Sequence, residues 1–136
     1  MLLAIGSAAF AGLTAILAKI GVEAVPSNVA TLIRTGVVLA FVAILVGLRR
    51  EWPQPGQLNA RSLLFLVLSG LTTGLSWLCY YRALQSGPAS AVAPLDKLSL
   101  PVAVLLAVLV LGERLTRWQW LGTALMTAGA LLVALR

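Results

Sequence analysis

Five long apolar runs, separated by short polar turns, make up most of the chain. They cover residues 2–22, 28–48, 62–84, 89–111 and 118–135, and each approaches the ~20 residues that a helix needs to cross a hydrocarbon core ~30 Å thick. Backbone groups in lipid must be hydrogen-bonded within their own segment, so runs of this length predict helices and not barrel strands. The pattern therefore predicts an all-α, polytopic membrane protein whose five transmembrane helices form one domain over residues 1–136.

The composition supports a membrane protein and excludes several other classes. Of 136 residues, 60% are hydrophobic and 10% are charged, against about 25% charged residues in soluble domains. The net charge of +6 comes mostly from Lys and Arg at the ends of the apolar runs, where they set topology and contact headgroups, so we expect no nucleic-acid binding. A single cysteine, Cys79, and no histidine exclude an intrachain disulfide and a Cys/His zinc cluster. No phosphate loop or nucleophile elbow is present, and we expect no metal, no cofactor and no enzyme activity.

The fourth run carries charges within its span. Asp96 and Lys97 lie seven to eight residues into the run, between Pro94 and Pro101. A charge at such a depth costs at least about 2.5–3.5 kcal/mol unless it is paired or faces a wet cavity. Each proline removes a backbone donor, so the run is predicted to bend or unwind between the two prolines, with free carbonyls near residues 90 and 97.

Five ionisable residues are predicted to share one layer of the membrane. Lys19, Arg34, Arg82, Asp96 and Lys97 all lie roughly 4–12 Å below the face opposite Met1, at about 1.5 Å per helical residue. One interpretation is the wall of a polar vestibule. The alternatives are that Lys19 and Arg82 only extend towards the headgroups, and that Arg34 and Asp96 form a structural ion pair.

Neighbouring polar and aromatic residues extend this candidate site. Ser99 falls on the same helical face as Asp96. Trp77 and Tyr81 align on the third run beside Arg82, either as an interfacial aromatic belt or as a cavity lining. The candidate substrate-binding or coupling residues are Asp96, Lys97, Arg34, Lys19, Ser99, Trp77, Tyr81 and Arg82. Glu113 and Arg114, at the tip of the fourth run, are predicted to form an ion pair that closes the turn or a gate.

Several stretches resemble a known transporter family. They are GLTAILAKIGVEAVPSNVATLIRT, GLSWLCYYRAL, PLDKLS and LLAVLVLGERLTRWQWLGTALMTAGALLV, and the LGERL turn is the most specific of them. Over essentially its whole length the chain is similar to a single EamA-type domain of the drug/metabolite transporter superfamily. Larger members resemble two such halves joined in inverted orientation, so the resemblance implies alternating access at a midplane site between halves. This chain supplies one half, which implies that it functions as a dimer.

These observations favour a small secondary transporter that moves a small metabolite or drug-like solute across the cytoplasmic membrane. The ten Lys and Arg residues divide evenly between the two membrane faces when embedded residues are counted, so an antiparallel homodimer of oppositely inserted chains is predicted. A parallel dimer, a heterodimer with a related half-domain and a non-transporting partner subunit remain alternatives. Four cations against Asp96 in the layer favour an anionic or zwitterionic solute. A hydrophobic cation held by Asp96 and the aromatic residues is the competing class.

Overall fold

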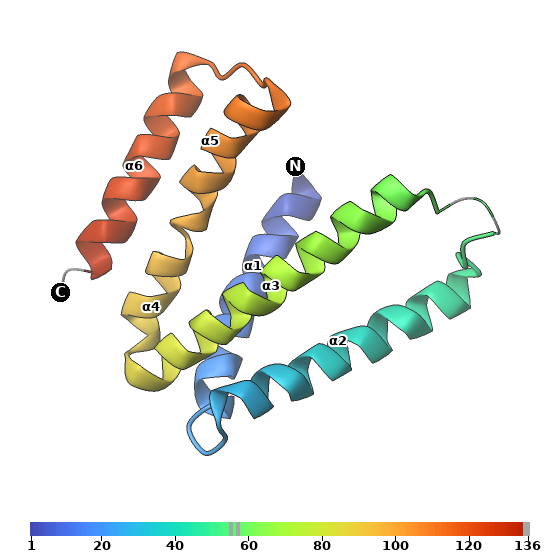
Figure 1. The fold of residues 1–136 in the computed structure, drawn as a ribbon. Coiled ribbons are helices and arrows are strands. Elements are labelled where there is room, and N and C mark those ends of the chain that lie inside the picture. The colour runs from blue at the N-terminus through green and yellow to red at the C-terminus, as the bar shows by residue number, and fades with distance from the viewer. Residues whose placement is uncertain (55, 57, 135–136) are drawn as a thin grey trace. The chain divides into compact units, whose positions relative to one another are not determined.

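The computed structural model describes residues 1–54, 56 and 58–134, and their regular secondary structure is helical (Figure 1). The first, second, third and fifth apolar runs each form one helix, and the fourth forms two. The helices of the described residues are α1 (Leu2–Gly21), α2 (Ser27–Arg49), α3 (Ala60–Ser86), α4 (Ala89–Asp96), α5 (Ser99–Leu111) and α6 (Arg117–Ala134).

Four segments of the described chain are long and apolar enough to cross a membrane. They are α1, α2, α3 and the combined α4–α5 segment Ala89–Leu111. The fifth predicted span forms the 18-residue α6, but it is not among these four, because Arg117 and Gln119 in its first turn lower its mean hydropathy. An all-α, polytopic membrane protein is therefore confirmed, with four segments of spanning character and a fifth helix.

The fourth apolar run is interrupted at Lys97 and Leu98. Pro101 has no N–H to donate to the Lys97 carbonyl, and the Leu100 N–H donates to that carbonyl instead, over 3.0 Å. This i→i+3 bond tightens the chain into a 3₁₀-type turn between α4 and α5. The predicted break between Pro94 and Pro101 is confirmed. The prediction of a free carbonyl near residue 97 is wrong, because Leu100 takes it.

Two helices begin at well-formed caps. Asn59 Oδ1 accepts a hydrogen bond of 2.7 Å from the Ser62 N–H at the start of α3. At the start of α6, Thr116 Oγ1 accepts from the Gln119 N–H at 3.3 Å, and Gln119 Oε1 accepts from the Thr116 N–H at 2.8 Å. This reciprocal pair is a capping box, which satisfies donors that the first turn leaves free. It defines where the turn after α5 ends.

Backbone proximity divides the chain into two compact units. The α4–α6 unit contains residues 1–17 and 86–136, and within it α6 lies alongside α4 and α5 (Figure 1). The α2–α3 unit is Ala18–Gln85 and contains the end of α1 together with α2 and α3. Each unit holds cavities of its own.

Little of the apolar surface is buried within the described chain. In the α2–α3 unit, Leu84, Val22 and Tyr81 are the best-buried large side chains, at 0%, 1% and 4% exposure. Most large aliphatic side chains of the helices are exposed instead. Lipid tails solvate such side chains as well as a protein core does, so helix packing in a membrane depends on close fit and polar contacts. The polar contacts inside the α2–α3 unit therefore indicate which side chains hold its helices together.

Candidate functional site

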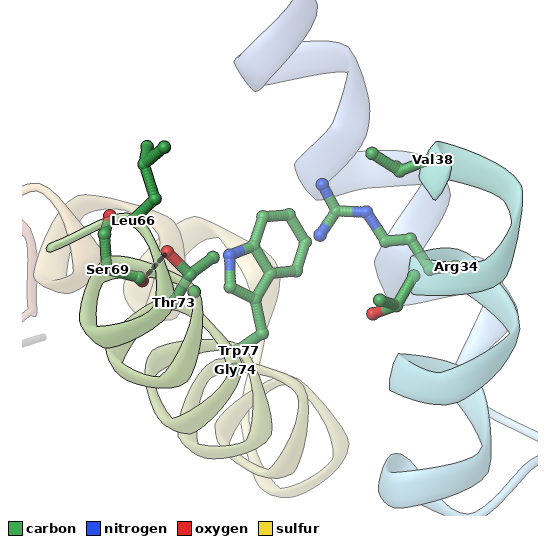
Figure 2. Close-up of a pocket in the computed structure, with 9 residues that line it drawn as sticks. Arg34, Val38, Leu66, Ser69, Thr73, Gly74 and Trp77 are labelled. Atoms are coloured by element: carbon green, nitrogen blue, oxygen red, sulfur yellow. Dashed lines mark hydrogen bonds between the residues drawn. The ribbon is translucent and has the colours of Figure 1, made fainter. Parts of the chain in front are cut away.

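Arg34 of α2 and Trp77 of α3 meet inside the α2–α3 unit. Arg34 lies about two turns after the start of α2, and Trp77 lies about two and a half turns before the end of α3, so these antiparallel helices carry them at a similar level. The guanidinium carbon Cζ is 2.8 Å from the centre of the Trp77 ring. Figure 2 shows the two side chains pointing towards one another across the space between the helices. This is a cation–π contact, in which the negative face of the indole attracts the charge.

The contact lies at one end of a groove with a volume of about 470 Å³. The two helices contribute a mixed surface of one cation, three hydroxyl residues, two glycines and apolar side chains, most of them visible in Figure 2. The lining residues are Arg34, Thr35, Val38, Leu66, Ser69, Gly70, Thr73, Gly74 and Trp77. The groove carries a positive charge and contains no acidic side chain among the residues that line it. We refer to it below as the α2–α3 groove.

The charge of Arg34 is only partly compensated by the protein. Its Nη1 is inaccessible to solvent and has no hydrogen-bond partner in the described chain. Neither the Arg49–Glu51 nor the Lys97–Asp96 ion pair includes it. Insertion of an arginine at membrane depth costs about 2.5–3.5 kcal/mol, whereas a cation–π contact returns about 0.5–2 kcal/mol. One donor of Arg34 therefore has no acceptor within the α2–α3 unit, and the alternative of an Arg34–Asp96 ion pair remains a prediction.

The threonine hydroxyls of the groove are already used within their own helices. Thr35 Oγ1 donates to the Thr31 carbonyl at 2.8 Å, and Thr73 Oγ1 donates to the Ser69 carbonyl at 2.7 Å (Figure 2). Such i→i−4 bonds satisfy hydroxyl protons locally. Arg34 is therefore the charged donor of the groove, beside the Ser69 hydroxyl and the Trp77 N–H.

An aromatic cluster supports the indole of Trp77. The ring centres of Trp77 and Tyr81 are 5.9 Å apart, and those of Trp77 and Tyr80 are 6.4 Å apart. Tyr80 and Tyr81 also meet edge to face, a favoured geometry for aromatic pairs. Tyr81 is buried, so it is not a residue of an interfacial belt. Trp77 lines the groove, in agreement with the cavity-lining interpretation.

Hydrogen bonds from Lys19 and Gln85 join the turn after α1 to the end of α3. Lys19 Nζ donates to the Leu84 carbonyl at 2.7 Å. Gln85 Nε2 donates to the Val22 carbonyl at 3.1 Å and to the Val25 carbonyl at 2.8 Å. Lys19 thus supports the packing of these helices and does not line the groove. Sequence reasoning missed Gln85, although a polar residue at the end of an apolar run beside a short turn is a usable signal.

Asp96 and Lys97 lie in the α4–α6 unit and pair with each other. Lys97 Nζ is 3.4 Å from Asp96 Oδ2, and the two side chains are 52% and 34% exposed, respectively. Lys97 also lines a cavity of about 500 Å³ between Pro94 and the residues of α6 around Gly129. The common layer that would join this pair to Lys19, Arg34 and Arg82 remains a prediction.

Two other predicted residues lie outside the cavities described here. Arg82 is exposed on α3, and Ser99 is exposed at the first position of α5. Neither lines the α2–α3 groove or the cavity beside Lys97. A binding role for these two side chains remains a prediction.

The predicted ion pair between Glu113 and Arg114 is not formed in the described structure. Gly112 ends α5 in the left-handed region, with φ of 70°, and the Glu113 N–H donates to the Ala107 carbonyl at 3.2 Å. The chain then leaves the helix, and successive side chains outside a helix do not share one face. Glu113 instead lines a cavity of about 290 Å³ with Gln119 and other residues of α5 and α6.

Comparison with known proteins places the chain among transporters. The chain is 53% identical over 128 residues to a protein of a Sinorhizobium species named "Uncharacterized transporter in cobO 3′ region", covering 94% of this chain and 91% of that protein. It is 34% identical over 84 residues to the "Probable 4-amino-4-deoxy-L-arabinose-phosphoundecaprenol flippase subunit ArnE" of Yersinia pestis, covering 62% of this chain and 73% of that protein. No solved structure matches the chain.

The family comparison covers nearly the whole sequence. The model of the EamA-like transporter family matches residues 1–135. This match confirms the resemblance that the LGERL turn and its flanking helices indicate. Together with the four segments of spanning character, it makes the protein a multi-pass membrane protein of a transporter family and not of an enzyme family. The chain belongs to the EamA-like transporter family.

Proposed function

We propose that the chain, as one five-helix EamA-like domain over residues 1–136, is half of a dimeric secondary transporter in the cytoplasmic membrane. The observation that carries this proposal is the α2–α3 groove, in which Arg34 meets Trp77 within two membrane-spanning helices. Intramembrane ionisable residues are costly and generally serve substrate or ion pathways. The groove would bind solute, and alternating access would expose it to either side.

A purely structural role explains Arg34 less well. A structural arginine in a membrane is normally paired with an acid or with backbone carbonyls, and the described chain gives Nη1 neither. A leucine or glutamine at this position would avoid the cost of about 2.5–3.5 kcal/mol that a charge incurs in the membrane. A charged side chain kept in the membrane despite this free-energy cost is consistent with an arginine that binds solute.

The sign of the charge favours an anionic or zwitterionic solute. A hydrophobic cation would need an acidic side chain or an open aromatic face. In the groove, the face of Trp77 is already in contact with Arg34. Asp96, the acid of the competing hypothesis, is paired with Lys97. An anion instead meets a guanidinium that has no acidic partner in the groove and whose planar fork suits carboxylates and phosphates.

The resemblance of residues 1–136 to one half of a larger transporter supports a dimer of such domains. One half-domain supplies one groove, and EamA-type transporters of full length resemble two halves in inverted orientation, so two chains would complete the transport path. Small residues such as Gly122 and Gly129 on α6 allow close helix contact. The even distribution of basic residues between the two faces supports an antiparallel homodimer.

A second candidate function is that of a subunit that works with a different half-domain. The relative from Yersinia pestis is named a probable flippase subunit, which supports a heteromeric transporter and a lipid-linked solute. In this case the chain alone would not transport. The site on α2 and α3 would be the same, but the partner groove would come from another protein.

Reconstitution of the purified chain alone tests the proposal. Proteoliposomes that contain only this chain are assayed for uptake of radiolabelled carboxylates and phosphate esters, with chemical cross-linking to report dimers. We expect saturable uptake and a cross-linked dimer in the same preparation. Dimers without uptake of any solute in the set would overturn autonomous transport and favour the second candidate. In that case, uptake that appears only on co-reconstitution with a related half-domain would establish the heteromer.

A further inference from the structure

We propose that the α2–α3 groove binds an amphiphilic oxyanion, with its anionic head on Arg34 and its apolar chain extending along α3 from Trp77 towards Leu66. This inference rests on the proposed transport function and names the solute class of the same site. The chemistry required is a phosphate ester or carboxylate attached to a hydrocarbon chain. A membrane lipid and a soluble amphiphile both satisfy it, and the test below separates them.

The head would be recognised mainly by Arg34, the charged donor of the groove. Arg34 lines the groove, takes part in neither ion pair described above and has an Nη1 without an acceptor in the described chain, so an oxyanion that enters the groove meets a guanidinium with unused hydrogen-bonding capacity. The hydroxyl protons of Thr35 and Thr73 are engaged by carbonyls of their own helices. With no carboxylate among the lining residues, nothing in the groove repels an anion. Charge-assisted bonds from a guanidinium to carboxylate or phosphate are among the strongest that proteins form.

The tail would lie along the remainder of the groove, which is mostly apolar and carries no charged side chain. At about 1.5 Å per residue, Leu66 and Trp77 are roughly 16 Å apart along the axis of α3. Val38 of α2 and Leu66 of α3 contribute apolar side chains to the lining (Figure 2). A Cβ atom built at Gly70 or Gly74 would meet nothing within 4 Å. The two glycines therefore leave space that no side chain of the described protein fills.

The arrangement also explains why an amphiphile is favoured over a small ion. An inorganic anion would use only the Arg34 end of the groove and would leave the apolar walls unoccupied. Each methylene that is removed from water strengthens binding by about fourfold. Affinity should therefore rise with chain length until the tail reaches Leu66.

Fluorescence of Trp77 provides a direct test, because the head would contact the guanidinium that lies over the indole. The other tryptophans are replaced (Trp52→Phe, Trp118→Phe, Trp120→Phe), and the protein in detergent is titrated with octyl phosphate, octanoate, inorganic phosphate and octyltrimethylammonium. We expect a saturable change in Trp77 emission with the two octyl anions. We expect inorganic phosphate to bind at least about tenfold more weakly and the ammonium compound to cause no change. Octyl phosphate and octyltrimethylammonium giving equal responses would overturn the proposal.

Variants distinguish the groove from nonspecific partition into detergent. Arg34→Gln should weaken octyl phosphate binding by at least about tenfold, and Arg34→Lys by less, because lysine retains the charge without the planar fork. Gly70→Leu should block the tail, whereas Gly36→Leu, on α2 outside the groove and with equally free space, should not. The same apparent affinity in all four variants would overturn the site assignment.

Binding measurements in lipid nanodiscs distinguish a membrane lipid from a soluble amphiphile as the natural ligand. If a membrane lipid is the natural occupant, addition of phosphatidylglycerol to phosphatidylcholine nanodiscs should raise the apparent Kd for octyl phosphate by competition. No change would identify a soluble amphiphile as the ligand. Binding without any flux in proteoliposomes would support this inference and refute transport by the chain alone. Arg34-dependent flux of other solutes without octyl phosphate binding would do the reverse.

Discussion

The coupling between Arg34 and Trp77 can be measured with a double-mutant cycle. The cycle compares the wild type with Arg34→Gln, Trp77→Leu and the double variant. Arg34 is half-buried and its Nη1 is inaccessible to solvent, so the Arg34–Trp77 pair belongs in the upper part of the range for cation–π pairs, which desolvated pairs reach. We expect an interaction free energy of about 1–2 kcal/mol.

The single variants should behave differently from one another. Trp77→Leu also removes the ring contacts with Tyr80 and Tyr81, which contribute about 0.5–1.5 kcal/mol each, and it leaves Arg34 without its aromatic partner. Arg34→Gln removes a charge whose cost in the membrane exceeds the cation–π gain, so it should leave the free energy of unfolding unchanged or raise it. The contacts of Trp77 with the tyrosines are lost with or without Arg34, so they cancel in the cycle.

Unfolding in mixed dodecyl maltoside and sodium dodecyl sulfate micelles, followed by far-UV circular dichroism, gives the four free energies. Arg34→Gln combined with Trp52→Leu serves as the control pair, because Trp52 is an exposed residue after α2 and should be additive. A coupling between Arg34 and Trp77 within about 0.3 kcal/mol of zero would refute the energetic account of the groove.

Three other perturbations test separate parts of the structure. Gln85→Ala should lower the free energy of unfolding by about 1 kcal/mol, since it removes hydrogen bonds to the Val22 and Val25 carbonyls; an unchanged unfolding curve would show that these bonds are dispensable. Thr116→Ala should cost about 1 kcal/mol and speed amide exchange in the first turn of α6, because it removes half of the capping box, whereas Thr116→Ser should retain protection. In a Cys79→Ala background, Leu58→Cys should be labelled by an impermeant maleimide from both sides of the membrane if chains insert both ways; labelling from one side only would exclude the antiparallel homodimer.

The helical fold was accessible to sequence reasoning because its determinants are local. Continuous apolar runs of spanning length predict helices, and the runs from residue 2, 28 and 62 correspond to α1, α2 and α3 within a few residues at either end. The break between Pro94 and Pro101 was also predictable, because a missing N–H acts on the backbone of its own turn. What local reasoning could not supply was the substitute donor, Leu100, which binds the Lys97 carbonyl.

The candidate site was only partly predictable, because it depends on which helices are neighbours. The depth of Arg34 and the aromatic face of Trp77 could both be read from the sequence. Their direct contact could not, since several cations and one acid were possible partners at a similar depth. Gln85 was missed because its function is to bind backbone carbonyls of a turn, which carry no signature in the side-chain pattern. The Glu113–Arg114 pair was expected from adjacency in the sequence, which alone does not bring two side chains together.

The central claim is that the guanidinium of Arg34 binds the solute during transport. The most direct test is the initial rate of anion uptake into proteoliposomes by wild type, Arg34→Lys, Arg34→Gln and the exposed control Arg49→Gln, at equal reconstituted protein. Loss of a charge-assisted hydrogen bond is worth about 1.5–3 kcal/mol, so Arg34→Gln should reduce uptake at low solute concentration by about 10- to 150-fold. Arg34→Lys should lie between Arg34→Gln and the wild type, and Arg49→Gln should match the wild type. Equal uptake by wild type and Arg34→Gln would contradict the account.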